Sequence, residues 1–168
     1  SSPPNATYAD PPYARGPMIL GSRTLHGRAA GLWCLSERAR REGRQHVLLA
    51  LDLDRFKHIN DSLGHDAGDR VLRWVAEQLK DCLGREALLA RMGGDEFTLL
   101  LQPRPTREMA LNRAIHVAEN ILGSLVRPFV LENREFFVTA SIGIALSPQD
   151  GDDLSQLMKN ADTAMYHA

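Results

Sequence analysis

Cysteine and net charge are both scarce in this sequence, and each scarcity excludes a class of protein. The 168 residues include only two cysteines, Cys34 and Cys82, too few for a disulfide framework or a zinc site. We expect both to be buried or half-buried thiols in a reducing cytoplasm. The formal net charge of −1 lacks the basic excess of a general nucleic-acid-binding domain.

Long apolar runs and several common site motifs are also missing. No apolar run approaches the roughly 18 residues of a membrane span, and no secretory signal opens the chain, so we expect a cytoplasmic protein with no membrane segment in this fragment. There is no GxxxxGK[ST] P-loop and no internal repeat. The histidines show no His–x₃–His or His–Glu pairing, which argues against a histidine-ligated zinc site or a histidine-driven nucleophilic mechanism.

What is present indicates one domain with a hydrophobic core. Hydrophobic residues make up 43% of the chain, enough for a single core at this length. Residues 1–17 hold five prolines without helical or strand periodicity, which indicates a disordered linker or a cloning remnant. The domain is therefore expected over residues 18–168.

The pattern along the domain alternates between strands and helices. Residues 31–44 predict a charged helix that ends at Gly43, and "HVLLALDLD" (46–54) is typical of a strand buried on both faces. Residues 55–69 predict a short helical turn and a loop. They are followed by a helix over 70–84 that Asp66 or Asp69 could cap.

The second half of the chain predicts hairpins and two more helices. Gly93 and Gly94, between "ALLARM" and "EFTLLLQ", are a two-residue hairpin signal. Thr106 would cap a long amphipathic helix, residues 129–148 predict a second hairpin with a long later arm, and 152–168 are helical. This order predicts a mixed sheet covered by helices, an α/β sandwich with one crossover.

Four carboxylates stand where two of the predicted strands would meet. Alternation points Asp52 and Asp54 to the same side of their strand, and Asp95 and Glu96 follow the glycine turn. If the two elements are sheet neighbours, these groups would repel, raise one another's pKa and favour a hard cation such as Mg²⁺. The alternative is that the acids merely mark strand ends in water.

Two neighbouring segments suggest a nucleotide. The "DRFKHIN" loop leaves a strand and enters a helical turn, so its backbone N–H groups could bind phosphate, or Phe56 and Ile59 could simply anchor it to the core. Asn60 and Asp69 together can read a guanine edge, because an amide donates to O6 or N7 and a carboxylate accepts from N1–H and the amino group. Each residue could equally be an ordinary helix-end residue.

Taken together, "LDLDRFKHINDSLGHDAGD" (51–69), "RMGGDEF" (91–97), "TASIGIALSP" (139–148) and "NADTAMYHA" (160–168) resemble the motifs of the GGDEF family of bacterial diguanylate cyclases, in the family's order. The resemblance covers roughly residues 45–168. It implies an α/β sandwich around a largely antiparallel sheet, related to the nucleotidyl cyclase core. It also implies condensation of two GTP into cyclic di-(3′→5′)-GMP with release of pyrophosphate, using Mg²⁺ or Mn²⁺.

The resemblance assigns roles position by position. It implies that Asp52 and Asp95 ligate metal together with the Leu53 carbonyl, and that Glu96 supports a second ion or the catalytic step. It implies guanine recognition by Asn60 and Asp69, and phosphate binding by the backbone around Arg55, Phe56 and Lys57. Gly93 and Gly94 would let the chain pass close to the nucleotide.

Partners follow from the same resemblance. One domain would hold one GTP, so two domains must face each other to form a two-fold symmetric catalytic dimer. Sensory or phosphodiesterase domains are expected in the full-length protein, and an isolated fragment should turn over slowly. The alternative function is a catalytically silent GTP-binding module that regulates a neighbouring domain, and a plain dimerisation scaffold is a third.

Three departures from the family pattern qualify the resemblance. An Arg-x-x-Asp product site is replaced by "GREA" (84–87), so no product inhibition through that site is expected. "ILGSRTL" (19–25) keeps little of an LTGLPNR-like motif. The domain is expected to be C-terminally truncated, without the lysine and arginine that follow "ADTAMYHA" in the family, which should weaken GTP binding.

Overall fold

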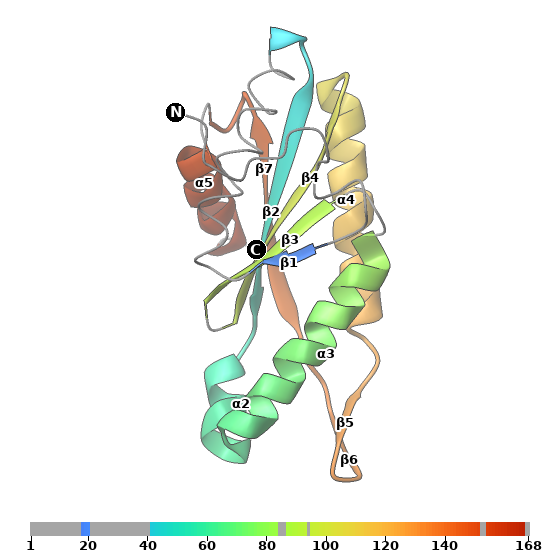
Figure 1. The fold of residues 1–168 in the computed structure, drawn as a ribbon, viewed down its shortest axis with the longest axis vertical. Helices are drawn as coiled ribbons and strands as arrows, with labels where there is room; N and C mark the ends of the chain where they lie inside the picture. The colour runs from blue at the N-terminus through green and yellow to red at the C-terminus, as the bar shows by residue number, and fades with distance from the viewer. Residues whose placement is uncertain (1–17, 21–40, 84–86, 94, 152–153, 167–168) are drawn as a thin grey trace.

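A five-stranded, largely antiparallel sheet forms the centre of the molecule (Figure 1). The computed structural model describes residues 18–20, 41–83, 87–93, 95–151 and 154–166. β1 runs parallel to β3, and every other pair in this sheet is antiparallel. The strand order is β1 (Met18–Leu20), β3 (Ala87–Gly93), β4 (Glu96–Arg104), β2 (Gln45–Leu53) and β7 (Ala140–Ser147).

Helices cover both faces of this sheet, as the sequence predicted (Figure 1). Residues of α3 and α4 share one core with Leu49, Leu51 and Leu53 of β2, whereas α5 packs on Leu48 and Ala50 from the opposite face. β2 is therefore buried on both sides, which explains its unbroken apolar run. The described helices are α2 (Phe56–Leu63), α3 (His65–Leu83), α4 (Arg107–Ser124) and α5 (Leu154–Tyr166).

The connections contain two crossovers among the described strands, where the sequence had predicted one. The chain leaves β2 through α2 and α3 and enters β3 beyond β4, and it later leaves β4 through α4 and reaches β7 beyond β2. This is the βαββαβ arrangement of ferredoxin-like folds. Each crossover returns the chain past an intervening strand, so β2 lies between β4 and β7 and is not an edge strand.

The second predicted hairpin is split in two. β5 (Phe129–Leu131) pairs with β6 (Arg134–Phe136) in a separate two-stranded sheet, through a turn in which Glu132 and Asn133 have positive φ. The long later arm is a distinct strand, β7, which joins β2 in the main sheet. Sequence alternation alone could not distinguish one long arm from two strands with different partners.

The helix boundaries partly confirm the sequence predictions. Thr106 caps α4 by accepting a hydrogen bond from the Met109 N–H at 3.2 Å. The capping role predicted for Asp66 or Asp69 was wrong, because α3 already begins at His65, directly after Gly64. Gly43 has a φ of 78°, as expected for a residue that ends a helix, but residues 21–40 of that predicted helix lie outside the described residues.

Other predictions concern single residues and the surface. Cys82 is half-buried, and its thiol donates to the Asn120 carbonyl at 3.6 Å, as expected of a packed thiol. Cys34 and the predicted linker over residues 1–17 lie outside the described residues.

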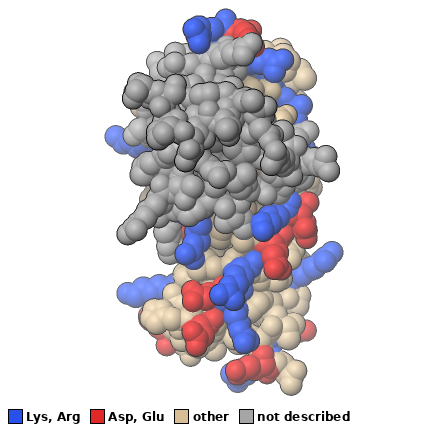
Figure 2. Space-filling view, in the orientation of Figure 1, with Lys and Arg blue, Asp and Glu red and all other residues tan. Residues whose placement is uncertain are grey.

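Acidic and basic side chains are interspersed on the described part of the face that Figure 2 shows. No helix in the described ranges is long and apolar enough to cross a membrane.

Candidate active site

The end of β2 brings together acids from distant parts of the chain. Asp52 lies opposite Glu96 of β4 on one side and Ser141 of β7 on the other. The turn between β3 and β4 folds back onto this end, because the Leu53 N–H donates to the Asp95 carbonyl at 3.2 Å. The predicted neighbourhood of Asp52, Asp95 and Glu96 is therefore present in the fold.

Asp52 lies in an environment that disfavours its charge. Burial raises its pKa to about 6, with further increases from a hydrogen bond and charge repulsion with Asp95 and from the charge of Asp54. Its Oδ1 is buried and has no hydrogen-bond partner among the described residues. A buried, unpaired carboxylate oxygen beside a second carboxylate is a position that a cation would stabilise.

Glu96 has a partner that the sequence analysis did not assign. Burial is the largest cause that raises its pKa to about 7. Asp162 of α5 raises it further through a hydrogen bond and through its charge, and Asp52 and Asp95 add smaller contributions. Asp52 and Glu96 both extend to the α5 face, the face of Leu48 and Ala50, because side chains alternate along β2. Sequence showed Asp162 only as part of the "NADTAMYHA" motif.

Asp54 lies near the other acids, since its charge contributes to the raised pKa of Asp52, but its carboxylate also has hydrogen-bond partners of its own. Its Oδ2 accepts a hydrogen bond from the Thr139 hydroxyl at 2.9 Å, and its Oδ1 accepts one from the Ser141 hydroxyl at 2.9 Å. Its backbone N–H also donates to the Thr139 carbonyl at 2.9 Å. Both carboxylate oxygens are therefore engaged in holding the start of β7 against the end of β2.

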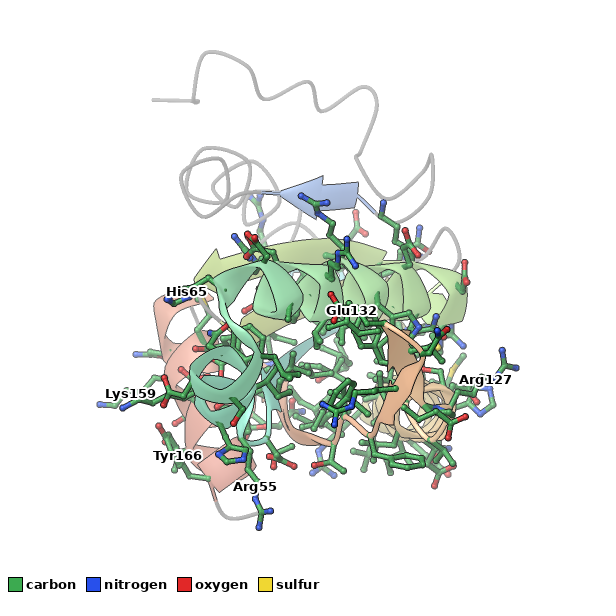
Figure 3. All side chains as sticks on the ribbon, turned by 90° about the horizontal axis from the view of Figure 1, so that it is seen from below. Arg55, His65, Arg127, Glu132, Lys159 and Tyr166 are labelled. Atoms are coloured by element: carbon green, nitrogen blue, oxygen red, sulfur yellow. The ribbon has the colours of Figure 1, made fainter. Side chains whose placement is uncertain are left out.

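The chain turns sharply from β2 into α2 at Arg55. Arg55 adopts a left-handed conformation with φ 57°, and its side chain makes no capping hydrogen bond to the helix. In Figure 3 the exposed Arg55 side chain extends away from the sheet. Phe56 anchors the first turn in the core, while Lys57 is exposed. The first turn of α2 thus presents backbone N–H groups without a side-chain cap, as an anion site requires.

Asn60 of α2 lies against Gly68, the residue before Asp69 in α3. Asn60 is half-buried, and a Cβ built on Gly68, the residue next to Asp69, would lie 1.9 Å from the Asn60 Oδ1. Asp69 itself is exposed to solvent. An amide and a carboxylate on adjacent helices are therefore available at one place, as the guanine-reading prediction requires.

The glycines of the turn are described only in part. Gly93 ends β3 and pairs with Glu96, after a register shift between Arg91 and Gly93. Gly94 lies outside the described residues, as do residues 84–86 of the loop for which no product inhibition was predicted. The hairpin itself is confirmed, with Gly93 as the last strand residue before the turn.

The donors at this end of the sheet fit a hard divalent cation in their chemistry. No group of three or more His, Cys, Asp or Glu side chains in the described ranges forms a metal-binding arrangement by itself. Mg²⁺, however, is usually bound through one or two carboxylates plus substrate phosphates, not in a complete protein cage. The unpaired Asp52 Oδ1 and the adjacent Asp95 carboxylate supply two such donors.

Comparison with known proteins identifies the fold and the family. The family model described as "Diguanylate cyclase, GGDEF domain" matches residues 31–168. The chain belongs to the GGDEF family. It is 41% identical over 132 residues to the bifunctional diguanylate cyclase/cyclic di-GMP phosphodiesterase MucR of Pseudomonas aeruginosa, and 42% identical over 136 residues to the diguanylate cyclase TpbB of that organism. These alignments cover 79% and 78% of the chain.

A solved structure shows the same architecture. The crystal structure of the GGDEF domain of TpbB superposes with a TM-score of 0.79 at 37% identity, covering 89% of each chain. The expected α/β sandwich with a largely antiparallel sheet is therefore confirmed. This GGDEF domain spans only 18% of MucR and 30% of TpbB, so the comparison characterises a domain and leaves the activity of a whole protein to be proposed.

Several contacts around the candidate site were not evident from the sequence. Asp162, Gly68 and the two hydroxyls that bind Asp54 had no predicted role, although all four lie in the motifs that carried the resemblance. Position within those motifs was the only available signal. Their contacts join segments far apart in the chain, 85 residues apart for Thr139 and Asp54.

Proposed function

We propose that this domain is a diguanylate cyclase that condenses two GTP into cyclic di-GMP and releases pyrophosphate, at a site shared by two domains. The observation that carries the proposal is the half-buried Asp52 carboxylate beside Asp95, with a buried, unpaired Oδ1 and a raised pKa. Membership in the GGDEF family supports the same reaction. A site that only marked a strand end would leave this carboxylate in water.

The metal-binding role is proposed for residues at the β2 end. Asp52, Asp95 and the Leu53 carbonyl would hold Mg²⁺ or Mn²⁺, with Glu96 contributing to a second ion or to the catalytic step. When bound, such ions neutralise triphosphate charge and lower the pKa of the ribose 3′-hydroxyl. A cation would also relieve the repulsion that raises the pKa of Asp52.

The nucleotide would lie along the start of α2. Backbone N–H groups of Phe56 and Lys57 would bind the phosphates, because the first turn has no side-chain cap and the positive end of the helix dipole favours anions. At the other end of the nucleotide, Asn60 would donate to guanine O6 or N7 while Asp69 accepts from N1–H and the amino group. Gly93 and Gly94 would allow the chain to approach the nucleotide.

Glu96 is the proposed acid–base group of the domain. Burial and the neighbouring Asp162 raise its pKa to about 7, which favours proton uptake by this carboxylate, the role of a catalytic base. The proton of the attacking 3′-hydroxyl could pass to this carboxylate. The hydroxyl oxygen would then attack the α-phosphorus of the second GTP, in line with the departing pyrophosphate.

Two domains are needed because the set of residues binds one nucleotide. Each domain would supply a 3′-hydroxyl and an α-phosphate, and a two-fold axis would place the two nucleotides antiparallel. An isolated domain must find its partner by diffusion, so its turnover should depend on concentration. Other domains of a longer protein would normally raise the local concentration.

The reaction is tested by incubating the chain with GTP and Mg²⁺ at high protein concentration and separating products by chromatography. Cyclic di-GMP that disappears in an Asp95→Ala variant supports the cyclase. GTP binding by calorimetry without any product supports the catalytically silent regulatory module. If neither GTP binding nor product is found, the proposed function is wrong, and a dimerisation scaffold is the remaining hypothesis.

A further inference from the structure

Gly68 is the fourth residue of α3. It is buried against α2, and a Cβ added there would lie 1.9 Å from the Asn60 Oδ1, 3.0 Å from the Asn60 Cγ and 3.2 Å from the Phe56 Cζ. Glycine within a helix lowers its stability relative to alanine. Because Gly68 has no Cβ, the backbone of α3 can lie in direct contact with the Asn60 side chain.

The contact also determines which end of the carboxamide points toward Gly68. A hydrogen of the Gly68 Cα occupies the direction of the missing Cβ, and the Asn60 Oδ1 lies on that side. A weakly positive Cα–H favours a carbonyl oxygen and disfavours an NH₂ group, whose hydrogens are also positive. We infer that this contact favours the carboxamide orientation in which Nδ2 is on the side away from Gly68.

This orientation matters for the choice of purine. Guanine presents an O6 acceptor where adenine presents an N6 amino donor, and both carry the N7 acceptor. A carboxamide held with Nδ2 outward can donate to guanine O6, whereas the reversed carboxamide would present its oxygen and suit adenine. A carboxamide that is free to flip can pair with either purine, whereas one held in this orientation favours guanine over adenine.

We propose that Gly68 is a specificity-determining positioning residue, which fixes the Asn60 carboxamide so that the domain prefers a guanine nucleotide to an adenine nucleotide. This inference rests on the proposed function, because it takes Asn60 and Asp69 as the base-reading pair. Gly68 acts through Asn60 and is not itself in contact with the reacting atoms. Its immediate neighbour Asp69 would read the opposite part of the guanine edge.

The chain provides a matched control for a glycine-to-alanine change. Gly123 also lies inside a helix, α4, but a Cβ there would meet nothing within 4 Å among the described residues. Gly68→Ala and Gly123→Ala each add one methyl group near the end of a helix, and they differ in the contact with Asn60. A third variant, Asn60→Ala, and the double variant Asn60→Ala/Gly68→Ala test whether Gly68 acts through Asn60.

The experiment measures GTP and ATP affinity of the five proteins by calorimetry with Mg²⁺, and records the Asn60 side-chain amide signals by NMR. Wild type and Gly123→Ala should prefer GTP equally. Gly68→Ala should lose about tenfold in GTP affinity, the size of one lost hydrogen bond, and its GTP-to-ATP preference should fall while the part that Asp69 provides remains. Its Asn60 amide signals should shift, and those of Gly123→Ala should not.

The double variant distinguishes positioning from general damage. In the Asn60→Ala background the clashing carboxamide is gone, so adding Gly68→Ala should cause no further loss of GTP affinity. An unchanged GTP preference in Gly68→Ala, or a full additional loss in the double variant, would overturn the inference while leaving the proposed function intact. A wild type that binds no GTP would instead refute the proposed function, and this inference with it.

Discussion

Gly143 of β7 and Ala161 of α5 are in direct backbone contact. A Cβ built on Gly143 would lie 1.9 Å from the Ala161 carbonyl oxygen and 2.6 Å from the Met165 nitrogen. Neither obstacle is a flexible side chain, so α5 can only accommodate a Cβ by moving away from the sheet. The residue after Ala161 is Asp162, the neighbour of Glu96.

We therefore expect Gly143→Ala to destabilise the fold by about 1–3 kcal/mol, the usual cost of overpacking, and to lower any cyclase activity. Urea denaturation followed by circular dichroism measures the first effect, and product formation measures the second. A Gly143→Ala variant with unchanged stability and activity would show that the position of α5 is not critical for Glu96.

Mutation of Asp52 and mutation of Asp54, two residues apart, should change the stability of the fold in opposite directions. Asp54→Ala removes the acceptor of two hydroxyl hydrogen bonds and should reduce stability by about 1–3 kcal/mol. Asp52→Asn removes a repelling, partly buried charge, so it should maintain or increase stability while abolishing metal-dependent activity. Denaturation midpoints and product assays on both variants check this contrast; equal stability losses would contradict it.

Stability should fall as pH rises through the range in which Asp52 and Glu96 ionise. Carboxyl groups of the unfolded chain titrate near pH 4, whereas the pKa values in the fold are raised to about 6 and about 7. Between these limits the folded state binds more protons than the unfolded state, so the free energy of unfolding decreases with pH until both groups are charged.

Mg²⁺ should counteract this loss because it binds the deprotonated carboxylates. We expect Mg²⁺ to raise the melting temperature clearly at pH 8 and little at pH 5, in scanning fluorimetry. Asp52→Asn is the control, since it removes one ligand and one of the titrating groups. The same Mg²⁺ shift at both pH values, or in the variant, would argue against a carboxylate metal site.

His46 should give the opposite pH dependence. It is 5% exposed, neither ring nitrogen has a hydrogen-bond partner among the described residues, and burial lowers its pKa to about 4. The unfolded state therefore binds more protons between about pH 6.5 and pH 4, and stability falls as pH decreases through that window, by up to about 3 kcal/mol. In denaturation at several pH values, His46→Leu should remove this component; an unchanged acid dependence in the variant would exclude His46 as its source.

Fusion of the chain to a parallel two-stranded coiled coil should raise turnover per domain at low protein concentration. The fusion replaces diffusional encounter with a high effective concentration, which typically reaches the millimolar range for short linkers. Product formation measured over a dilution series should be steeply concentration-dependent for the unfused chain and nearly independent for the fusion. Identical dilution profiles would contradict the two-domain site.

The sequence alone predicted the features that depend on neighbouring residues. The apolar run of β2, the glycine hairpin before Glu96 and the Thr106 cap all follow from periodicity or turn chemistry within a few residues. It also predicted that Asp52, Asp95 and Glu96 would meet if their two strands were neighbours in the sheet, and β2 and β4 are neighbours. The sequence also predicted that neighbouring carboxylates would raise one another's pKa, as Asp52 and Glu96 do.

Only the tertiary structure decided how those residues divide their roles. In the fold, Asp54 accepts hydrogen bonds from Thr139 and Ser141. Asp162 lies beside Glu96, and Gly68 lies against Asn60. None of these contacts leaves a local pattern, because each joins elements whose approach depends on the packing of the entire sheet and its helices. The sequence determined which chemical groups this GGDEF domain possesses, and the fold determined which of them are free to act, because only packing shows which polar atoms already have partners.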